Sequence, residues 1–428
     1  MKNKSMFAAF CLLLVFALIA GCSNDDTGSG RTKDGEVQLV MWAHQGQPKE
    51  VDFYKKRIDD FNTAYKGKIH VKLKIIPSGA GHAYEDKINA AATSNGLPDV
   101  LDMDGPFVGN YAATGLLAPI DSYIPDKDKK DFADSIIQQG TYDKKLYALG
   151  AMESSVVLFY NKKLLKEAGI QAPEKIDDAW DWNEFLEVSK KLTTEKTKGL
   201  TMHMDLGVGE WFTYMGSVFV WSNGGDLLNE DRTKADGYLN GKESVEALEY
   251  VQKLFKEKVV SMSNGPTDFE EGRAAMMLGG VWLIPGFEEY KDLDWGITYF
   301  PYAKEKASPS GSWAFGVSSQ SKFPKEAAEV VKWMSNKDSV VEISKITGMP
   351  PARASAFDEL KEYDEMPKKA IKDQVLESAT ARPSTPAYPV LTAKFAEAFQ
   401  AAALGQDVKK ALDKATEDTE RELERFNK

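Results

Sequence analysis

Apolar residues along the chain follow strand-like and helix-like patterns in turn. Residues 37–42 form a short apolar run, which is typical of a buried strand. The next segment carries apolar side chains at helical spacing, at Val51, Tyr54, Ile58, Phe61 and Tyr65. Residues 69–75 then alternate between apolar and polar side chains, as in a strand with one buried face. The order strand, helix, strand predicts an α/β protein built on a largely parallel sheet.

The second half of the chain continues in the same style. Residues 155–160 are predicted to form a strand, and residues 182–192 a helix. Asp181 and Glu184 are placed to form a capping box at the start of this helix. A last amphipathic stripe over residues 408–426 predicts a terminal helix that packs on the body of the protein.

The N-terminus predicts where the protein is located. Lys2 and Lys4 precede a mostly apolar run over residues 6–20, which is typical of a signal peptide that we place at residues 1–21. The run is shorter than the roughly 20 residues that span a bilayer, so a lasting transmembrane anchor is disfavoured.

The residues that follow predict how the mature protein is held. The sequence Ile19-Ala20-Gly21-Cys22 resembles a bacterial lipobox, in which the cysteine is lipidated and becomes the new N-terminus. This resemblance implies an anchor at Cys22 on the outer face of the bacterial cell membrane; a secreted protein with a chance Gly-Cys pair is the alternative. Residues 23–35 contain no apolar side chain, so residues 22–35 are predicted to be a lipidated cysteine and a flexible tether.

Composition excludes several functions. The 428 residues include 54 Lys plus Arg and 65 Asp plus Glu, a net charge of −11, so no broad cationic surface is available for nucleic acid. The cysteines, Cys11 and Cys22, both lie near the N-terminus, and the four histidines show no metal-ligand spacing. Neither a disulfide within the body nor a structural zinc site is therefore expected. The length suggests two domains, at roughly 150 residues per domain.

The loops carry the chemistry that the sequence offers. The common signatures of phosphate-binding loops, dinucleotide-binding turns, zinc proteases and serine hydrolases are missing from the chain. Aromatic, amide and carboxylate side chains instead gather in predicted loops, at His44, Gln45, Asp102, Asp104, Trp211, Trp221, Asn223, Trp282 and Trp313. The apolar face of a sugar stacks on an indole, and its hydroxyls pair with planar polar groups. This combination favours a carbohydrate-binding site.

Each of these residues also has a purely structural interpretation. Tryptophans are often part of a core, and His44 could be a loop histidine whose partners are all internal. Asp104 could cap the turn at Gly105-Pro106, and Glu153 could be a solvated residue at a domain crossing. Arg353 fits either a hinge ion pair or a donor to a ligand hydroxyl.

Several short segments, in this order along the chain, resemble the family 1 extracellular solute-binding proteins of sugar transport, which are related to maltose-binding protein. They are Leu39-Val40-Met41-Trp42, Leu97-Pro98-Asp99-Val100, Gly115-Leu116-Leu117-Ala118-Pro119-Ile120, Phe159-Tyr160-Asn161-Lys162-Lys163-Leu164-Leu165, Ser222-Asn223-Gly224-Gly225, Phe269-Glu270-Glu271-Gly272-Arg273-Ala274-Ala275-Met276-Met277 and Gly311-Ser312-Trp313-Ala314-Phe315-Gly316-Val317. The resemblance extends through the whole mature chain.

The resemblance implies a type II periplasmic-binding-protein-like fold. Two α/β lobes, each discontinuous in sequence, are expected to be joined by a hinge of three crossings, with a ligand cleft between them. The lobes are placed at residues 36–150 plus 317–350 and at residues 151–316 plus 351–428, with crossings near residues 149–154, 311–318 and 349–353. Closure around a ligand would make affinity depend on the contacts and on the open-to-closed equilibrium.

The resemblance also implies a ligand site formed by both lobes. The candidates are Trp42, His44, Gln45, Asp102, Asp104, Glu153, Trp221, Asn223, Trp282, Gly311, Ser312 and Trp313, to which Arg353 is added from its own chemistry. The family often has Asn-Gly-Pro before the stacking tryptophan, whereas this chain has Gly279-Gly280-Val281 before Trp282. Asp102 and Asp104 also differ from the Trp-containing loop of maltose-binding protein, which weakens the expectation of a maltodextrin preference.

The expected function is that of a lipid-anchored, monomeric receptor of an ABC importer. Such a protein captures a mono- or oligosaccharide and delivers it to the transmembrane subunits of the permease, without catalysis and without a cofactor. One alternative is a binding protein for a non-sugar or modified-sugar solute. The other is a surface-anchored glycoside hydrolase, because paired carboxylates in an aromatic cleft would also suit that chemistry.

Overall fold

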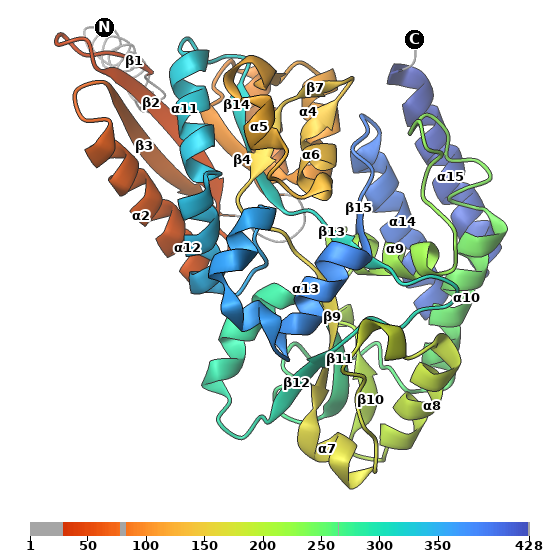
Figure 1. The fold of residues 1–428 in the computed structure, drawn as a ribbon. Coiled ribbons are helices and arrows are strands. Elements are labelled where there is room, and N and C mark those ends of the chain that lie inside the picture. The colour runs from red at the N-terminus through yellow and green to blue at the C-terminus, as the bar shows by residue number, and fades with distance from the viewer. Residues whose placement is uncertain (1–28, 78–82, 264, 427–428) are drawn as a thin grey trace, which may run out of the picture.

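The computed structural model describes residues 29–77, 83–263 and 265–426, and arranges them in two α/β lobes (Figure 1). The predicted signal peptide and Cys22 lie outside the described residues. The predicted flexible tether is wrong for its last part, because Gly30 and Arg31 form a strand that pairs with residues 37–38 of the first lobe. In the part of the chain that is described, no helix is both long enough and apolar enough to cross a membrane.

The first lobe is built on a mixed sheet. β2 (Val37–His44) pairs in parallel with β3 (Ile69–Ile76) and with β4 (Val100–Asp104). β14 (Trp313–Ser318) lies antiparallel beside β4, and β5 (Leu117–Ala118), β8 (Ala148–Gly150) and β1 (Gly30–Arg31) are added in antiparallel pairs. The expectation of a largely parallel sheet is wrong. The chain returns from the second lobe as β14, which runs antiparallel to β4, β5 and β8.

Alternation along β2 places side chains on both faces of this sheet. Leu39 and Met41 pack in one hydrophobic layer with α2 and α11, whereas Val40 and Trp42 pack in the other with α3 and α4. The helices and short elements of the first lobe are α2 (Pro48–Ala64), α3 (Ala83–Thr93), η1 (Gly105–Phe107), α4 (Val108–Ala113), η2 (Asp121–Tyr123), α5 (Asp126–Lys129), α6 (Asp134–Gly140), β6 (Thr141–Tyr142), β7 (Lys145–Leu146), α11 (Pro324–Met334) and α12 (Lys337–Thr347).

The second lobe surrounds a smaller sheet. β9 (Val156–Asn161) runs antiparallel to both β11 (Ala274–Gly280) and β12 (Trp295–Thr298), and β10 (Lys198–Thr201) is parallel to β11. The other elements of this lobe are α7 (Lys162–Glu167), η3 (Ile176–Asp178), α8 (Trp182–Leu192), η4 (Met204–Leu206), α9 (Glu210–Ser222), α10 (Lys242–Lys256), η5 (Val281–Glu289), β13 (Ser308–Ser310), α13 (Lys368–Glu377), β15 (Ala379–Ala381), α14 (Tyr388–Ala403) and α15 (Val408–Phe426).

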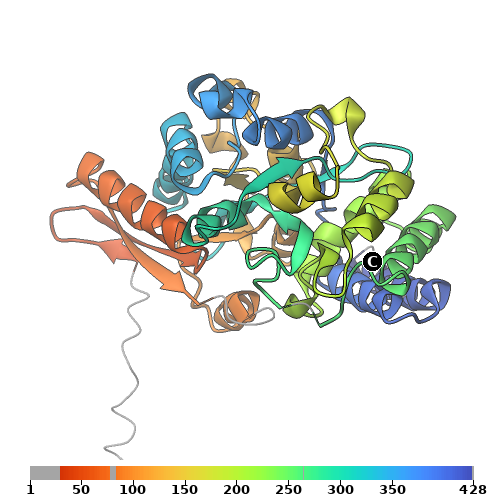
Figure 2. The ribbon, with the colours of Figure 1, turned by 90° about the horizontal axis from the view of Figure 1, so that it is seen from below.

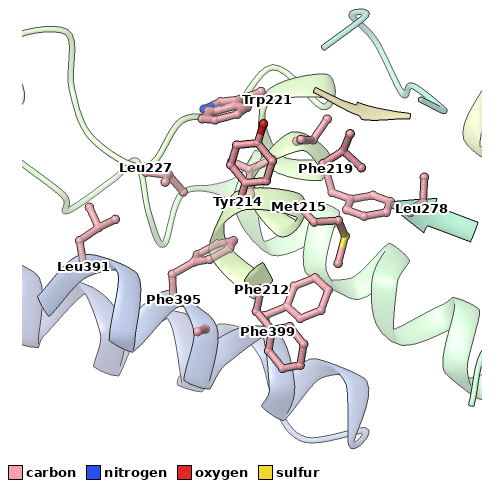
Figure 3. Packing of buried hydrophobic residues seen from close by; sticks show 14 of the residues in the cluster. Phe212, Tyr214, Met215, Phe219, Trp221, Leu227, Leu278, Leu391, Phe395 and Phe399 are labelled. Carbon is pink, nitrogen blue, oxygen red and sulfur yellow. The ribbon is translucent and has the colours of Figure 1, made fainter. Parts of the chain in front are cut away.

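Packing in the second lobe agrees with the predicted helices. The capping box is confirmed: the Asp181 side chain accepts from the backbone of Glu184, whose side chain accepts from the Asp181 backbone. The terminal helix is confirmed as α15, which lies beside α14 and α10 (Figure 2). Phe212 of α9 packs on Phe399 of α14 with ring centroids 5.3 Å apart (Figure 3).

The chain crosses between the lobes in three segments, here called passages. The boundaries of the second and third passages differ slightly from those expected. The expected boundary between residues 316 and 317 falls inside β14, whose residues pair with the first sheet from position 313 onward. Pro351 and Arg353 still bridge to Met152 and Phe132, so the first lobe extends past residue 350. The third passage runs through η6 (Ala354–Glu359) and η7 (Lys361–Asp364). Both boundaries move because strand and bridge pairing, which local sequence does not encode, decides where a lobe begins.

Candidate ligand-binding site between the lobes

Several strand ends bring predicted residues together at one edge of the first sheet. β2 ends at His44, β4 ends at Asp104, and β14 begins at Trp313, which is paired in register with Asp104. The indole of Trp313 stacks on the imidazole of His44, with ring centroids 3.4 Å apart and planes 7° apart. The backbone N–H and Nδ1 of His44 both contact the buried carboxylate of Asp102, the latter at 2.7 Å.

Glu153 lies where the passages between the lobes meet. Its buried carboxylate accepts hydrogen bonds from the Ser135 hydroxyl, from the Gly311 backbone N–H at 2.7 Å and from the Ser154 backbone N–H at 3.1 Å. Its own backbone N–H donates to Pro350 at 2.8 Å. Burial raises the pKa of the Glu153 carboxyl, and the hydrogen bonds to the carboxylate offset part of that rise. The Glu153 side chain therefore connects the first passage to α6 and to the residues before β14, and its backbone N–H ties it to Pro350, ahead of the third passage.

The second lobe contributes a group of aromatic residues to the same region. We define it as Trp211 and Tyr214 of α9 and Trp282 of η5. The indoles of Trp211 and Trp282 meet edge to face with centroids 6.0 Å apart, and Tyr214 lies 5.8 Å from Trp282. Both indoles are only partly buried. Partly exposed aromatic rings of this kind can stack on the apolar face of a ring-shaped ligand.

Arg382 links the two lobes at this place. Its guanidinium donates to both oxygens of Asp104, each at 2.8 Å, and also to Glu210 at the start of α9. It lies 4.6 Å from the centre of the Tyr214 ring. Asp104 belongs to the first lobe and Glu210 and Tyr214 to the second, so the ion pair spans the gap between them.

The electrostatics of this ion pair follow from burial. Burial raises the pKa of Glu210, while the charge of Arg382 and the hydrogen bonds from Tyr388 and Thr392 lower it. Burial disfavours the charged form of Arg382 as well, but Asp104, Tyr388 and Glu210 together outweigh this and keep the pKa of Arg382 above its ordinary value. The guanidinium is therefore a fixed positive charge between two carboxylates.

Two predicted residues make their contacts within the second lobe. The Nε1 of Trp221 donates to Asp226 at 3.2 Å, and the amide of Asn223 donates to the Glu243 carbonyl at 2.9 Å and to Glu246 at 3.1 Å. These bonds fasten the loop after α9 and the start of α10. The structure does not bring Trp221 and Asn223 together with the aromatic group.

Trp42 and Arg353 make their contacts within the first lobe. Trp42 is buried in the layer under α3, with the Lys87 ammonium 5.2 Å from its ring centre. Arg353 pairs with Asp128 at 2.8 Å and with Asp131 at 3.1 Å. Its Nε also donates to the Ser335 carbonyl at 2.8 Å, so all of these partners belong to the first lobe.

The remaining predicted residues lie close to the hinge and to the end of β2. Gly311 adopts a φ of +87°, and a Cβ there would lie 2.3 Å from the Oε1 of Gln139. The Ser312 backbone binds the same glutamine amide, through N–H and C=O contacts of 3.1 Å each. Gln45 follows β2 with its side chain exposed and its backbone N–H bonded to Ile76.

A cavity of about 570 Å³ also lies between the lobes. It is lined by α6 of the first lobe, by the loop over residues 226–232, and by the end of α13 with β15. Ser135 lines this cavity and also donates to Glu153, so the cavity borders the hinge. None of the predicted site residues lines the cavity. No cluster of His, Cys, Asp and Glu suited to a metal ion occurs among the described residues.

Sequence reasoning missed several residues of this site. Glu210, Tyr214, Arg382 and Tyr388 converge there from distant parts of the chain. Trp211 was visible as an aromatic residue near glycines, and Arg382 stands in a segment rich in Pro, Ser and Thr. Glu210 carried no signal, because an acidic residue in the first turn of a helix is ordinary.

Comparisons with known proteins show a matching family and several relatives of similar length. A family model described as a bacterial extracellular solute-binding protein matches residues 56–371. The galactooligosaccharide-binding protein of Bacillus subtilis is 24% identical over 434 residues, which covers 97% of each chain. The arabinooligosaccharide-binding protein of the same organism is 23% identical and covers 85% of this chain and 84% of its own.

Solved structures have the same fold. The cyclic alpha-maltosyl-1,6-maltose binding protein from Arthrobacter globiformis superposes with a TM-score of 0.78 at 27% identity, covering 91% of this chain and all of its own. A cyclo/maltodextrin-binding protein complexed with maltotetraose has a TM-score of 0.73 at 22% identity and covers 92% of this chain and 98% of its own. These similarities confirm the two-lobe fold expected from the sequence.

Proposed function

The chain belongs to the family of bacterial extracellular solute-binding proteins, and from this membership we propose that it captures a sugar between its lobes for an ABC importer. The ligand is a mono- or oligosaccharide, and the recipient is the transmembrane part of the importer. The family and the relatives described above are binding proteins, so the proposed role is capture and delivery rather than catalysis.

One observation carries this proposal: Tyr214 of the aromatic group lies 4.6 Å from the guanidinium of Arg382, which binds carboxylates of both lobes. Trp282 and Trp211 offer apolar ring surface, and Asp104, Glu210 and Arg382 offer charged acceptors and donors. A sugar has an apolar face and a rim of hydroxyls, so it needs both kinds of partner. The names of the relatives, which bind galacto- and arabinooligosaccharides, support a sugar of this class.

The first experiment is a thermal-shift screen of residues 29–428, which keep β1, against mono-, di- and oligosaccharides, followed by calorimetry. A ligand at about 100 times its Kd adds roughly 2.7 kcal/mol of stability, so a specific sugar raises the Tm clearly. We expect Trp282→Ala to weaken binding about tenfold or more, because it removes a stacking ring. A folded protein that responds to no sugar would instead indicate a non-sugar solute.

The matched control for this variant is Trp333→Ala. Trp333 is also a partly buried tryptophan, but it packs in the first lobe against Arg57, whose guanidinium lies 4.7 Å from its ring. This variant should lower stability and leave affinity near that of the wild type. Recovery of the bound sugar intact, at one molecule per protein, separates a receptor from a glycoside hydrolase.

We further propose that the mature protein is a monomer held at the outer face of the cell membrane through lipidated Cys22. The lipobox-like sequence and the apolar run before it support this anchor. Cys22→Ala should release the protein from the membrane fraction and leave its sugar affinity unchanged, because the substitution changes no residue of the proposed site. Membrane attachment that survives the substitution would contradict the anchor.

A further inference from the structure

His44 lies between two carboxylates at the end of β2. Its Nδ1 is 2.7 Å from Asp102, and its Nε2 is 3.5 Å from Glu50 of α2. The side chain of His44 is only 4% exposed. Each carboxylate also accepts from a buried tyrosine, Asp102 from Tyr84 at 2.7 Å and Glu50 from Tyr54 at 2.5 Å.

This arrangement selects the protonation state of His44. A carboxylate only accepts hydrogen bonds, so both ring nitrogens of His44 face acceptors and both favour carrying a proton. The tyrosines supply O–H donors and no positive charge, so the imidazolium is the cation that faces the two carboxylates. Asp104, at the end of β4, adds a further negative charge, and Trp313 of β14 adds none.

The same imidazole covers one face of Trp313. The two rings are nearly parallel at a centroid distance of 3.4 Å, which is the geometry of a cation over an indole. Tyr84 lies 5.8 Å from Trp313 at a tilt of 57° and borders the indole at an angle. Trp313 itself is only partly buried and pairs in register with Asp104, the first-lobe end of the inter-lobe ion pair.

We propose that His44 is a positioning residue: as a buried imidazolium it holds Trp313 flat at the lobe interface, and so makes ligand affinity dependent on pH. The inference rests on the proposed sugar-binding function, in which the uncovered face of Trp313 stacks on the ligand. His44 itself does not touch the ligand, because its two nitrogens and one of its faces are already occupied.

The direction of the pH dependence follows from the charges. Burial alone lowers the pKa of His44, but Asp102, Glu50 and Asp104 together raise it above the ordinary 6.5. The folded protein therefore binds this proton more tightly than the unfolded chain. The proton on His44 therefore contributes its full stabilisation below pH 6.5, and this contribution is lost as the pH rises through the native pKa of His44.

The first measurement needs no ligand. The emission of Trp313 is taken as the difference between wild type and Trp313→Phe, from about pH 5.5 to pH 9.5. A protonated imidazole in contact with an indole quenches its emission, so we expect an increase with a midpoint above 6.5. Glu50→Gln keeps an acceptor for Tyr54 but removes a charge, and should move the midpoint to lower pH.

The second measurement uses a sugar identified in the screen described above. Its affinity should weaken roughly fivefold as pH rises through the same midpoint, and this change should be absent in Trp313→Leu, which has no aromatic face for the imidazolium to hold. His70→Gln is the control, since His70 is exposed on β3, and it should keep the wild-type profile of both signals.

These outcomes separate the two proposals. A pH-independent Trp313 emission, or a midpoint that Glu50→Gln does not lower, overturns the positioning role whatever the ligand is. An affinity that does not follow the emission midpoint overturns the link to binding. A normal emission profile with no sugar bound supports the positioning of Trp313 by His44 and contradicts the proposed sugar-binding function instead.

Discussion

At the scale of single residues, the buried Glu153 holds together the segments that meet at the hinge. Its carboxylate accepts from Ser135 in the first lobe and from Gly311 before β14, and its backbone N–H binds Pro350. Glu153 therefore fastens the first passage to α6, to the residues before β14 and to the residues ahead of the third passage, where the lobes can hinge. A hydrogen-bonded hub is worth more than its separate bonds, because losing it leaves several buried donors unsatisfied.

These hydrogen bonds predict losses of stability of different size for two substitutions. Glu153→Ala should lower the free energy of unfolding by about 2–4 kcal/mol, because the buried donors of Ser135, Ser154 and Gly311 lose their acceptor. Glu153→Gln keeps the acceptor oxygen and should cost much less. Because burial raises the pKa of Glu153, the folded wild type binds the proton more tightly, so its stability falls as pH rises from about 4.5 through the native value.

Urea denaturation of the two variants as a function of pH measures both effects. The glutamine variant should lack the part of the pH dependence that Glu153 contributes in this window. Equal losses of stability in Glu153→Gln and Glu153→Ala at neutral pH would contradict the hub.

At the scale of elements, α4 of the first lobe meets the segment that precedes α14. A Cβ at Gly109 of α4 would lie 2.7 Å from the backbone nitrogen of Thr385 and 2.8 Å from the backbone of Ser384. Phe107 and Tyr388 meet edge to face at 5.3 Å beside this contact. The two lobes therefore approach backbone to backbone here, and only glycine leaves room for that approach.

Gly109→Ala should push these elements apart without unfolding either lobe. We expect about a tenfold loss of ligand affinity, because overpacking at a tight contact costs about 1–3 kcal/mol. Small-angle scattering with saturating ligand should show a larger radius of gyration than for the wild type. Gly286→Ala is the control, since a Cβ there meets no atom within 4 Å; the same loss in both variants would refute this explanation.

At the scale of the whole molecule, the ion pair of Arg382 with Asp104 and Glu210 joins the lobes. Arg382 is 4% exposed, so removing its charge leaves two partly buried carboxylates facing each other. Arg382→Met should therefore reduce stability by about 1–3 kcal/mol, less than a fully buried pair because water still reaches both carboxylates.

A double-mutant cycle tests this prediction. Asp104→Asn added to Arg382→Met should cost little more than Arg382→Met alone, because the repulsion between the carboxylates is then gone. Scattering profiles of the single and double variants without ligand report whether the lobes separate. Strictly additive losses in urea denaturation would show that Arg382 and Asp104 do not act as a pair.

Local signals in the sequence determined the elements of this protein. Asp181 and Glu184 lie three residues apart and form the capping box wherever that helix packs. Alternation over residues 69–75 produced β3, and the stripe after residue 408 produced α15. The family resemblance added the two-lobe arrangement, and the near meeting of His44, Asp104 and Trp313 follows from where their strands end.

Only the tertiary structure decided how those elements combine. Arg382 and Asp104 are 278 positions apart, and no local pattern marks them as partners. Asn223 and Trp221 have side chains suited to a sugar, yet the turn of α9 directs them to Glu243 and Asp226. Residue type sets what a side chain can bind, whereas strand register, helix phase and the hinge set what it meets. The polypeptide carries the first kind of information locally and the second only when folded.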